Sequence, residues 1–218
     1  MRFAVLISGT GSNLRALLDA AASGALPARI VAVISNRADA PGLRHAARAG
    51  VPTAIVTAQP GDSREAYDAR LDAALAAFAP DAILLAGFMR ILGAGFVQRH
   101  AGRLLNIHPS LLPRHKGLDT HARALAAGDA EHGASVHFVT PELDGGPVIV
   151  QAVTALHAGD TVDGVKSRVH ALEHRLYPLV AGWLARGRLQ WRDGRAWLDG
   201  RELSHPLRFP SLEEIPDP

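Results

Sequence analysis

The sequence contains no cysteine. Disulfide bonds, thiolate catalysis and cysteine-ligated zinc sites are therefore excluded, and the composition agrees with a protein of the reducing cytoplasm. No uninterrupted apolar run is long enough to span a bilayer, and no signal-peptide cleavage site follows the short apolar stretch near the N-terminus. We therefore expect a soluble, cytoplasmic protein that has no membrane partner.

Neither sign of charge is in large excess. The formal net charge is +2, and the arginines are spread along the chain instead of forming basic runs with interleaved aromatic residues. Nucleic acid is therefore not an expected partner. An apolar content of 48% over 218 residues is typical of a globular chain that buries a core. Because no repeat or linker divides the chain, we expect a single domain at 1–200 and a loosely attached, proline-rich tail at 201–218.

Apolar runs alternate with helical patterns through the first half of the chain. The runs typical of buried strands lie at 3–7, 30–34, 53–56, 82–86 and 104–107, and helical segments lie between them at 14–22, 43–49 and 64–78. This alternation predicts an α/β fold with a doubly wound, mostly parallel sheet. Later segments predict a helix at 120–127, a hairpin from 134–139 and 148–155, a long helix over 161–186 and a small terminal hairpin.

Asn106 and His108 stand two residues apart at the end of a predicted strand, so their side chains point to the same side of the sheet. Pro109 keeps His108 extended and stops a helix from starting there. A carboxamide can stabilise a developing oxyanion while an imidazole moves a proton, which suits chemistry at a carbonyl carbon. The alternative is a strand end whose polar side chains only satisfy turn backbone.

A glycine turn at 8–13 joins the first predicted strand to the first helix. Free backbone amides and the helix dipole favour an anion at such a turn. Leu14 stands where the dinucleotide fingerprint has its third glycine, no acidic residue ends the second strand, and the Gly-Lys-Ser/Thr of a Walker loop is absent. The turn therefore favours a phosphate monoester over NAD or ATP, with a tight turn that binds nothing as the alternative.

Asp144 lies at the tip of the predicted hairpin, where it could pair with His108 and favour the protonated imidazolium. The alternative is a turn aspartate that bonds its own backbone. His170–His174 matches the H-x-x-E-H pattern of inverted zinc proteases, but no downstream acidic ligand is obvious. We expect no metal, and we expect Glu173 to face the ligand cleft. Among the other histidines, His137 on the hairpin strand is the one to follow.

Four motifs together resemble the phosphoribosylglycinamide formyltransferase family of purine synthesis. They are Ser-Gly-x-Gly-Ser-Asn at 8–13, Ala-Gly-Phe-Met-Arg-Ile-Leu at 86–92, Asn-Ile-His-Pro-Ser-Leu-Leu-Pro at 106–113 and Leu-Asp-Gly-Gly-Pro at 143–147. The resemblance runs from residue 1 to about residue 198. It implies a Rossmann-like fold and formyl transfer from 10-formyltetrahydrofolate to the amine of 5-phosphoribosylglycinamide. One departure is Asp119, where some members have histidine.

The resemblance also implies roles for particular residues. The catalytic set is Asn106, His108 and Asp144, in which Asn106 and His108 stabilise the oxyanion and Asp144 orients the imidazole and keeps it protonated. The residues implied for the ribonucleotide are Gly11, Ser12, Asn13, His170 and Glu173. Those implied for the folate are Arg64, Met89, Arg90, Ile91, Leu92, Asn106, Thr140, Pro141, Glu142, Leu143 and Asp144. Direct attack by the amine requires no metal.

Two other functions stay open from the sequence. A 10-formyltetrahydrofolate hydrolase would use the same three catalytic residues but would need no phosphate-binding turn. A phosphosugar-binding protein would bind the phosphate without transferring a formyl group. The expected partners are the two small-molecule substrates, and the chain is expected to be a monomer or a homodimer.

Overall fold

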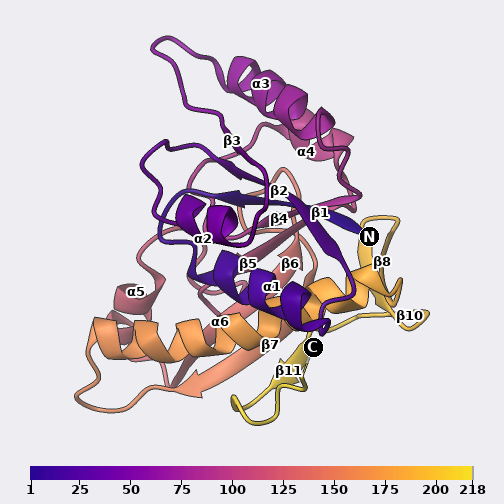
Figure 1. The fold of residues 1–218 in the computed structure, drawn as a ribbon. Helices are drawn as coiled ribbons and strands as arrows, with labels where there is room; N and C mark the ends of the chain where they lie inside the picture. The colour runs from indigo at the N-terminus through magenta and orange to yellow at the C-terminus, as the bar shows by residue number, and fades with distance from the viewer. Residues whose placement is uncertain (218) are drawn as a thin grey trace.

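The computed structural model describes residues 1–217 and contains an eight-stranded sheet with helices on both faces (Figure 1). The strand order is β11-β7-β6-β5-β4-β1-β2-β3. The strands are β1 (Arg2–Ile7), β2 (Arg29–Ser35), β3 (Thr53–Ile55), β4 (Ala82–Leu85), β5 (Leu104–His108), β6 (Glu131–Phe138), β7 (Val148–Ala155) and β11 (Leu207–Phe209). Strands β1 to β5 run parallel, and β6 is antiparallel to both of its neighbours. The predicted doubly wound, mostly parallel sheet is confirmed.

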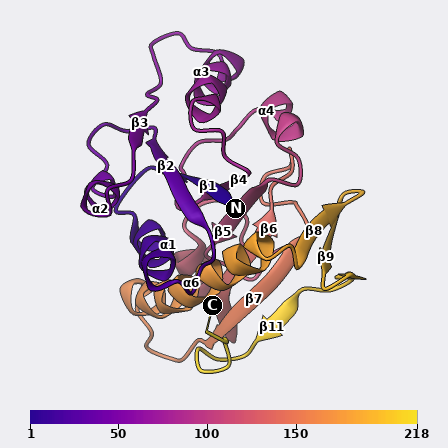
Figure 2. The same ribbon diagram turned by 45° about the vertical axis from the view of Figure 1, so that its right-hand side comes forward.

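The helices divide between the two faces of the sheet. They are α1 (Ser12–Ser23), α2 (Leu43–Arg48), α3 (Arg64–Ala76), α4 (Ala94–Arg99), α5 (Thr120–Ala126) and α6 (Val162–Ala185). Side chains of α1, α2 and α6 belong to one core cluster, and those of α3 and α4 belong to the other. Figure 2 shows α1 and α6 side by side on their face.

Burial on both faces explains why the strands read as continuous apolar runs. Along β1, Phe3, Val5 and Ile7 point into the cluster beneath α1 and α6, whereas Ala4 and Leu6 point into the cluster beneath α3. All five side chains are fully buried. Neither face of this strand carries polar residues, so its sequence shows no alternation of apolar and polar positions.

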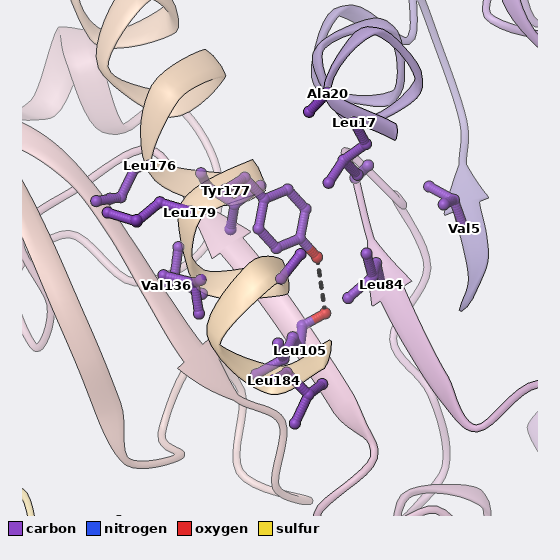
Figure 3. Packing of buried hydrophobic residues seen from close by; sticks show 14 of the residues in the cluster. Val5, Leu17, Ala20, Leu84, Leu105, Val136, Leu176, Tyr177, Leu179 and Leu184 are labelled. Carbon is purple, nitrogen blue, oxygen red and sulfur yellow. Dashed lines mark hydrogen bonds between the residues drawn. The ribbon is translucent and has the colours of Figure 1, made fainter. Parts of the chain in front are cut away.

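Tyr177 ties α6 to the middle of the sheet (Figure 3). Its hydroxyl lies 3.0 Å from the carbonyl oxygens of both Leu85 and Leu105 and donates to them. The ring is fully buried, and this burial raises the pKa of the hydroxyl well above its ordinary value of 10. Because Leu105 precedes Asn106, the tyrosine fixes the strand that carries Asn106 from behind.

The chain ends in a small antiparallel sheet and a docked tail. The predicted terminal hairpin is present as β8 (Leu189–Arg192) and β9 (Arg195–Leu198), and β10 (Arg201–Glu202) adds a third strand. The expectation of a loosely attached tail is wrong. Strand β11 pairs with β7, as Figure 2 shows, and Ile215 is fully buried. Arg175 of α6 donates to the carbonyl oxygens of Leu212 and Ile215, at 3.3 and 2.6 Å.

Replacing Ile215 with alanine tests this docking. We expect the free energy of unfolding to fall by about 3 kcal/mol, because truncating a fully buried isoleucine removes apolar contacts and leaves a cavity. Urea unfolding measures the change, and Leu207→Ala at a partly exposed position of the same tail is the control. Equal, small losses for both variants would contradict the docked arrangement.

Within residues 1–217, no helix is long and apolar enough to cross a membrane.

Candidate active site

The site lies at the carboxyl edge of the sheet, where β1 and β4 are neighbours. The chain winds outward from these two strands in opposite directions, which makes this edge the switch point at which doubly wound sheets bind ligands. The Ser8 amide donates to the Gly87 carbonyl at 3.1 Å, and the Met89 amide donates to the Ser8 hydroxyl at 2.7 Å. The glycine turn and the loop after β4 are thus joined directly.

Asn106, His108 and Asp144 meet at this edge. His108 is buried at the end of β5, and its Nδ1 lies 3.5 Å from Oδ2 of Asp144. Its Nε2 lies 3.0 Å from the His115 carbonyl oxygen. Asp144 also accepts a hydrogen bond from the Gly117 amide at 2.9 Å. Both ring nitrogens of His108 therefore face oxygen atoms that can accept a hydrogen bond.

Two adjoining cavities open beside this trio. The larger has a volume of about 730 Å³, and its wall includes Asn106, His108 and Asp144. The smaller has a volume of about 100 Å³, shares Asn106 and Asp144 with the first, and is walled partly by Leu85 and Val97. Apolar walls with a few convergent polar groups are typical of sites for small organic ligands.

The structure brings most of the residues implied for the folate to these cavities. Met89, Arg90 and Ile91 line the larger cavity, and Leu92 lines the smaller one together with Thr140, Pro141, Glu142, Leu143 and Asp144. Arg64 lines neither cavity. It begins α3 and lies beside Gly93, at the outer end of the loop that follows β4.

The residues implied for the ribonucleotide lie around the N-terminus of α1. Gly11 caps this helix with a φ of 73°, and a Cβ there would approach the Gly42 Cα to 2.7 Å, so both conformation and space require glycine. No side chain caps α1, so the amides of its first turn remain available to an anion. The Asn13 carboxamide donates to Glu173 Oε2 at 2.9 Å. His170 lies one turn before Glu173 on α6 and is half-buried.

Glu173 has an unusual environment for a carboxyl group. Burial raises its pKa from 4.5 to about 7, although the hydrogen bond from Asn13 acts in the opposite direction. The protonated carboxyl is therefore well populated near neutral pH. Such a group can both donate and accept hydrogen bonds.

The Glu173→Gln variant tests this environment through the pH dependence of the free energy of unfolding. Between pH 4.5 and about 7 the folded carboxyl holds a proton that the unfolded chain releases, so the stabilisation is complete below this window and is lost as pH rises through it. Relative to the variant, the wild-type protein should lose stability on the order of 3 kcal/mol from pH 4.5 to pH 8. Urea unfolding at both pH values measures the difference.

The exposed Glu214→Gln variant is the control for the substitution itself. Its free energy of unfolding should change with pH as that of the wild-type protein does. If Glu173→Gln also followed the wild-type pH dependence, the carboxyl would not be buried as described.

A polar stripe across β5, β6 and β7 supports the loop that follows His108. In this register His108 pairs with Ser135, and Ser135 pairs with Gln151. The Ser135 hydroxyl accepts from the Leu112 amide at 3.1 Å and from Gln151 Nε2 at 3.0 Å, and it donates to the Ser110 carbonyl at 2.7 Å. The sequence reasoning missed Ser135 and Gln151, whose only signal was their polarity within apolar strands.

Ser135→Ala should lower the free energy of unfolding by about 1–3 kcal/mol. The change leaves the buried Leu112 amide and the Ser110 carbonyl without their partner, and unpaired buried groups bear the full cost of lost hydration. Differential scanning calorimetry measures the loss, and the exposed Ser204→Ala is the control. An unchanged melting temperature for Ser135→Ala would contradict the supporting role of the stripe.

The H-x-x-E-H segment forms no metal centre in the part of the chain that the structure describes. Its two histidine rings stack on each other with centroids 6.0 Å apart, while Glu173 bonds to Asn13. Across residues 1–217, no group of three or more His, Cys, Asp or Glu side chains is arranged to hold a metal ion.

Comparisons with known proteins agree with this geometry. Residues 1–181 match the family model described as formyl transferase. The chain is 55% identical to phosphoribosylglycinamide formyltransferase of Escherichia coli over 93% of this chain and 96% of that protein, and 46% identical to the Haemophilus influenzae protein of that name over 93% and 95%. The solved structure of phosphoribosylglycinamide formyltransferase from Coxiella burnetii in complex with CHES superposes with a TM-score of 0.92, at 49% identity, over 96% of this chain and 99% of that chain.

Proposed function

The chain belongs to the formyl transferase family, and we propose that it transfers a formyl group from 10-formyltetrahydrofolate to the amine of 5-phosphoribosylglycinamide in purine biosynthesis. The observation that carries the proposal is the meeting of Asn106, His108 and Asp144 on one cavity wall, at the sheet edge that also holds the uncapped N-terminus of α1. One site can therefore bring a formyl donor and a phosphorylated acceptor together.

The cavities suit the folate co-substrate. The smaller cavity is walled by apolar side chains, and its polar groups come from Arg90, Asn106, His137 and the 140–144 turn. A flat, heteroaromatic ring needs such a pocket. Met89 and Ile91 are exposed at the larger cavity, where their apolar surface can cover the middle of the ligand. Arg64, farther out on α3, can meet a carboxylate at the end of the ligand.

The N-terminus of α1 suits the phosphate of the acceptor. The backbone amides after Gly11 donate to the phosphate oxygens, and Ser12 adds a hydroxyl donor. Asn13 and Glu173 stand next to this turn and can bond the ribose hydroxyls, with His170 one turn away. Such binding holds the glycinamide amine in reach of the cavity that contains His108.

The protein contributes to the reaction mainly by stabilising charge on the reacting groups. The amine nitrogen forms a bond to the formyl carbon, and the carbonyl oxygen takes up the negative charge. Asn106 donates an amide proton to this oxyanion, and the His108 imidazolium adds its positive charge. Asp144 orients the ring and balances its positive charge. When the bond from the formyl carbon to N10 breaks, one proton leaves the former amine and one proton reaches N10.

The reaction partners are the two small molecules. The cysteine-free composition fits the cytoplasm, and we propose a monomer or a homodimer, which sedimentation velocity distinguishes.

A ribonucleotide-dependence assay tests the proposed function. The protein is mixed with 10-formyltetrahydrofolate, and loss of the formyl group from the folate is followed by absorbance with and without 5-phosphoribosylglycinamide. We expect turnover only when the ribonucleotide is present. Equal turnover without it would contradict the transferase and identify a hydrolase, whereas phosphate-ligand binding with no turnover would identify a binding protein.

A further inference from the structure

His137 stands directly across from Asn106 in the antiparallel pair of β5 and β6. Its Nε2 lies 3.1 Å from Nδ2 of Asn106, and its Nδ1 lies 2.8 Å from the Phe138 carbonyl oxygen. The side chain is 2% exposed. The catalytic roles proposed above leave this buried histidine without a function.

The two contacts of His137 determine its tautomer. A carbonyl oxygen can only accept a hydrogen bond, so Nδ1 carries the proton that is donated to Phe138. Burial lowers the pKa of His137 to about 4, so the ring is neutral and Nε2 carries a lone pair. Asp144 Oδ1 lies 3.9 Å from Nε2, which is too far for a hydrogen bond.

The lone pair on His137 in turn determines the orientation of Asn106. A carboxamide presents an NH₂ group on one side and an oxygen on the other. Only the NH₂ side is attracted to a lone pair, so Nδ2 of Asn106 must face His137. Within residues 1–217, this nitrogen has no other hydrogen-bond partner, and Asn106 lines both cavities. Its second amide proton is thus available to a ligand.

We propose that His137 is a positioning residue, which holds the Asn106 carboxamide in the orientation that directs an amide N–H at the reacting oxygen. If the Asn106 carboxamide flipped, its oxygen would face the developing negative charge and repel it. The inference rests on the proposed formyl transfer, because it concerns the group that stabilises the oxyanion of that reaction. The backbone carbonyl of Phe138 is the remote anchor of the arrangement.

Three substitutions separate this role from general support of the fold. His137→Asn places an amide nitrogen near the Nδ1 position, so it can donate to Phe138 but offers nothing to Asn106. His137→Gln reaches the Nε2 position with a carbonyl oxygen and can accept from Asn106. Asn106→Ala removes the group on which His137 is proposed to act.

We expect His137→Asn to lower kcat by about 10- to 100-fold with little change in either KM, because a misdirected oxyanion donor affects the transition state more than substrate binding. His137→Gln should recover kcat to within about threefold of wild type. The double variant His137→Asn/Asn106→Ala should be no slower than Asn106→Ala alone, since both changes remove the same interaction. Multiplying effects, or a Gln variant as slow as the Asn variant, would overturn the proposal.

Val136→Ala is the control for destabilisation. This fully buried side chain belongs to the core cluster beneath α6, on the face of β6 away from Asn106. It should lower the melting temperature while kcat below the transition stays near the wild-type value. A comparable loss of kcat in this variant would show that weakening β6 is enough, and that His137 has no specific role.

A spectroscopic measurement separates failure of the positioning role from failure of the proposed function. In ¹⁵N–¹H spectra, the Asn106 amide proton that faces His137 should exchange slowly with solvent in the wild-type and His137→Gln proteins and quickly in His137→Asn. Fast exchange in the wild-type protein would overturn the positioning role whatever the turnover. Absent ribonucleotide-dependent turnover in the wild-type protein would instead overturn the proposed function.

Discussion

Replacing His108 with alanine is expected to lower kcat by about 10³-fold, while the KM of each substrate changes little. Removal of a group that transfers a proton or carries charge in the transition state typically costs 10²- to 10⁴-fold. His108 lies at the cavity wall with Nδ1 facing Asp144, so its loss removes both the imidazole and the contact that links Asp144 to the reaction. Initial-rate kinetics with both substrates varied measures kcat and KM separately.

The control for this variant is His205→Ala, which replaces an exposed histidine of the tail. Circular dichroism and urea unfolding of both variants exclude loss of the fold as the cause. Near-full transferase activity of His108→Ala would remove His108 from the mechanism. An equal fall in activity for His205→Ala would point to a defect in the preparation.

Replacing Asp144 with asparagine is expected to lower kcat by about 10²- to 10⁴-fold, the upper figure being the loss seen when the carboxylate that orients the imidazole of a Ser-His-Asp triad becomes asparagine. The amide oxygen of asparagine can still accept from the Gly117 amide, so the turn keeps its anchor. The substitution removes the negative charge that lies 3.5 Å from Nδ1 of His108. The same rate measurements test this variant.

Asp144→Ala provides the comparison, because it removes both the charge and the acceptor for Gly117. The alanine variant should also loosen the turn and lower the melting temperature, whereas the asparagine variant should melt near the wild-type temperature. If asparagine retained wild-type kcat, the charge of Asp144 would have no catalytic role and only its hydrogen-bonding geometry would matter.

The fold was predictable where burial left an unbroken pattern. The runs at 82–86 and 104–107 predict strands because parallel strands between two helical layers are apolar on both faces. The start of β6 was less visible. His132 and Gly133 look unlike a strand interior, but a Cβ at Gly133 would collide with the Ala152 carbonyl oxygen of β7, so the close approach of β7 requires glycine.

The tail was mispredicted for a related reason. Its strand β11 has only three residues and lies at the sheet edge, and its core contacts come from scattered side chains such as Phe209, Leu212 and Ile215. Neither leaves a periodic pattern, and the surrounding prolines are typical of loose segments. The contacts of Arg175 with the tail carbonyl oxygens depend on the tertiary structure, and no local sequence pattern predicts them.

In the candidate site, too, local spacing was predictable from the sequence and tertiary contacts were not. The spacing of Asn106 and His108 was enough to place both on one face of a strand, since side chains alternate along it. The approach of Asp144 to His108 depends on how the β6–β7 hairpin folds back beside β5. Only the family resemblance therefore predicted that these two residues lie close together. The pairing of Asn106 with His137 depends on the same register, and no spacing in the sequence indicates it.

The fate of a labelled formyl carbon tests the central claim most directly. The protein is supplied with ¹³C-formyl-labelled 10-formyltetrahydrofolate and 5-phosphoribosylglycinamide, and the products are followed by ¹³C NMR. Direct attack by the amine predicts that the label appears in an amide-bonded formyl group on the ribonucleotide, in step with the release of tetrahydrofolate. Label that appears as free formate, with the ribonucleotide unchanged, would contradict the account.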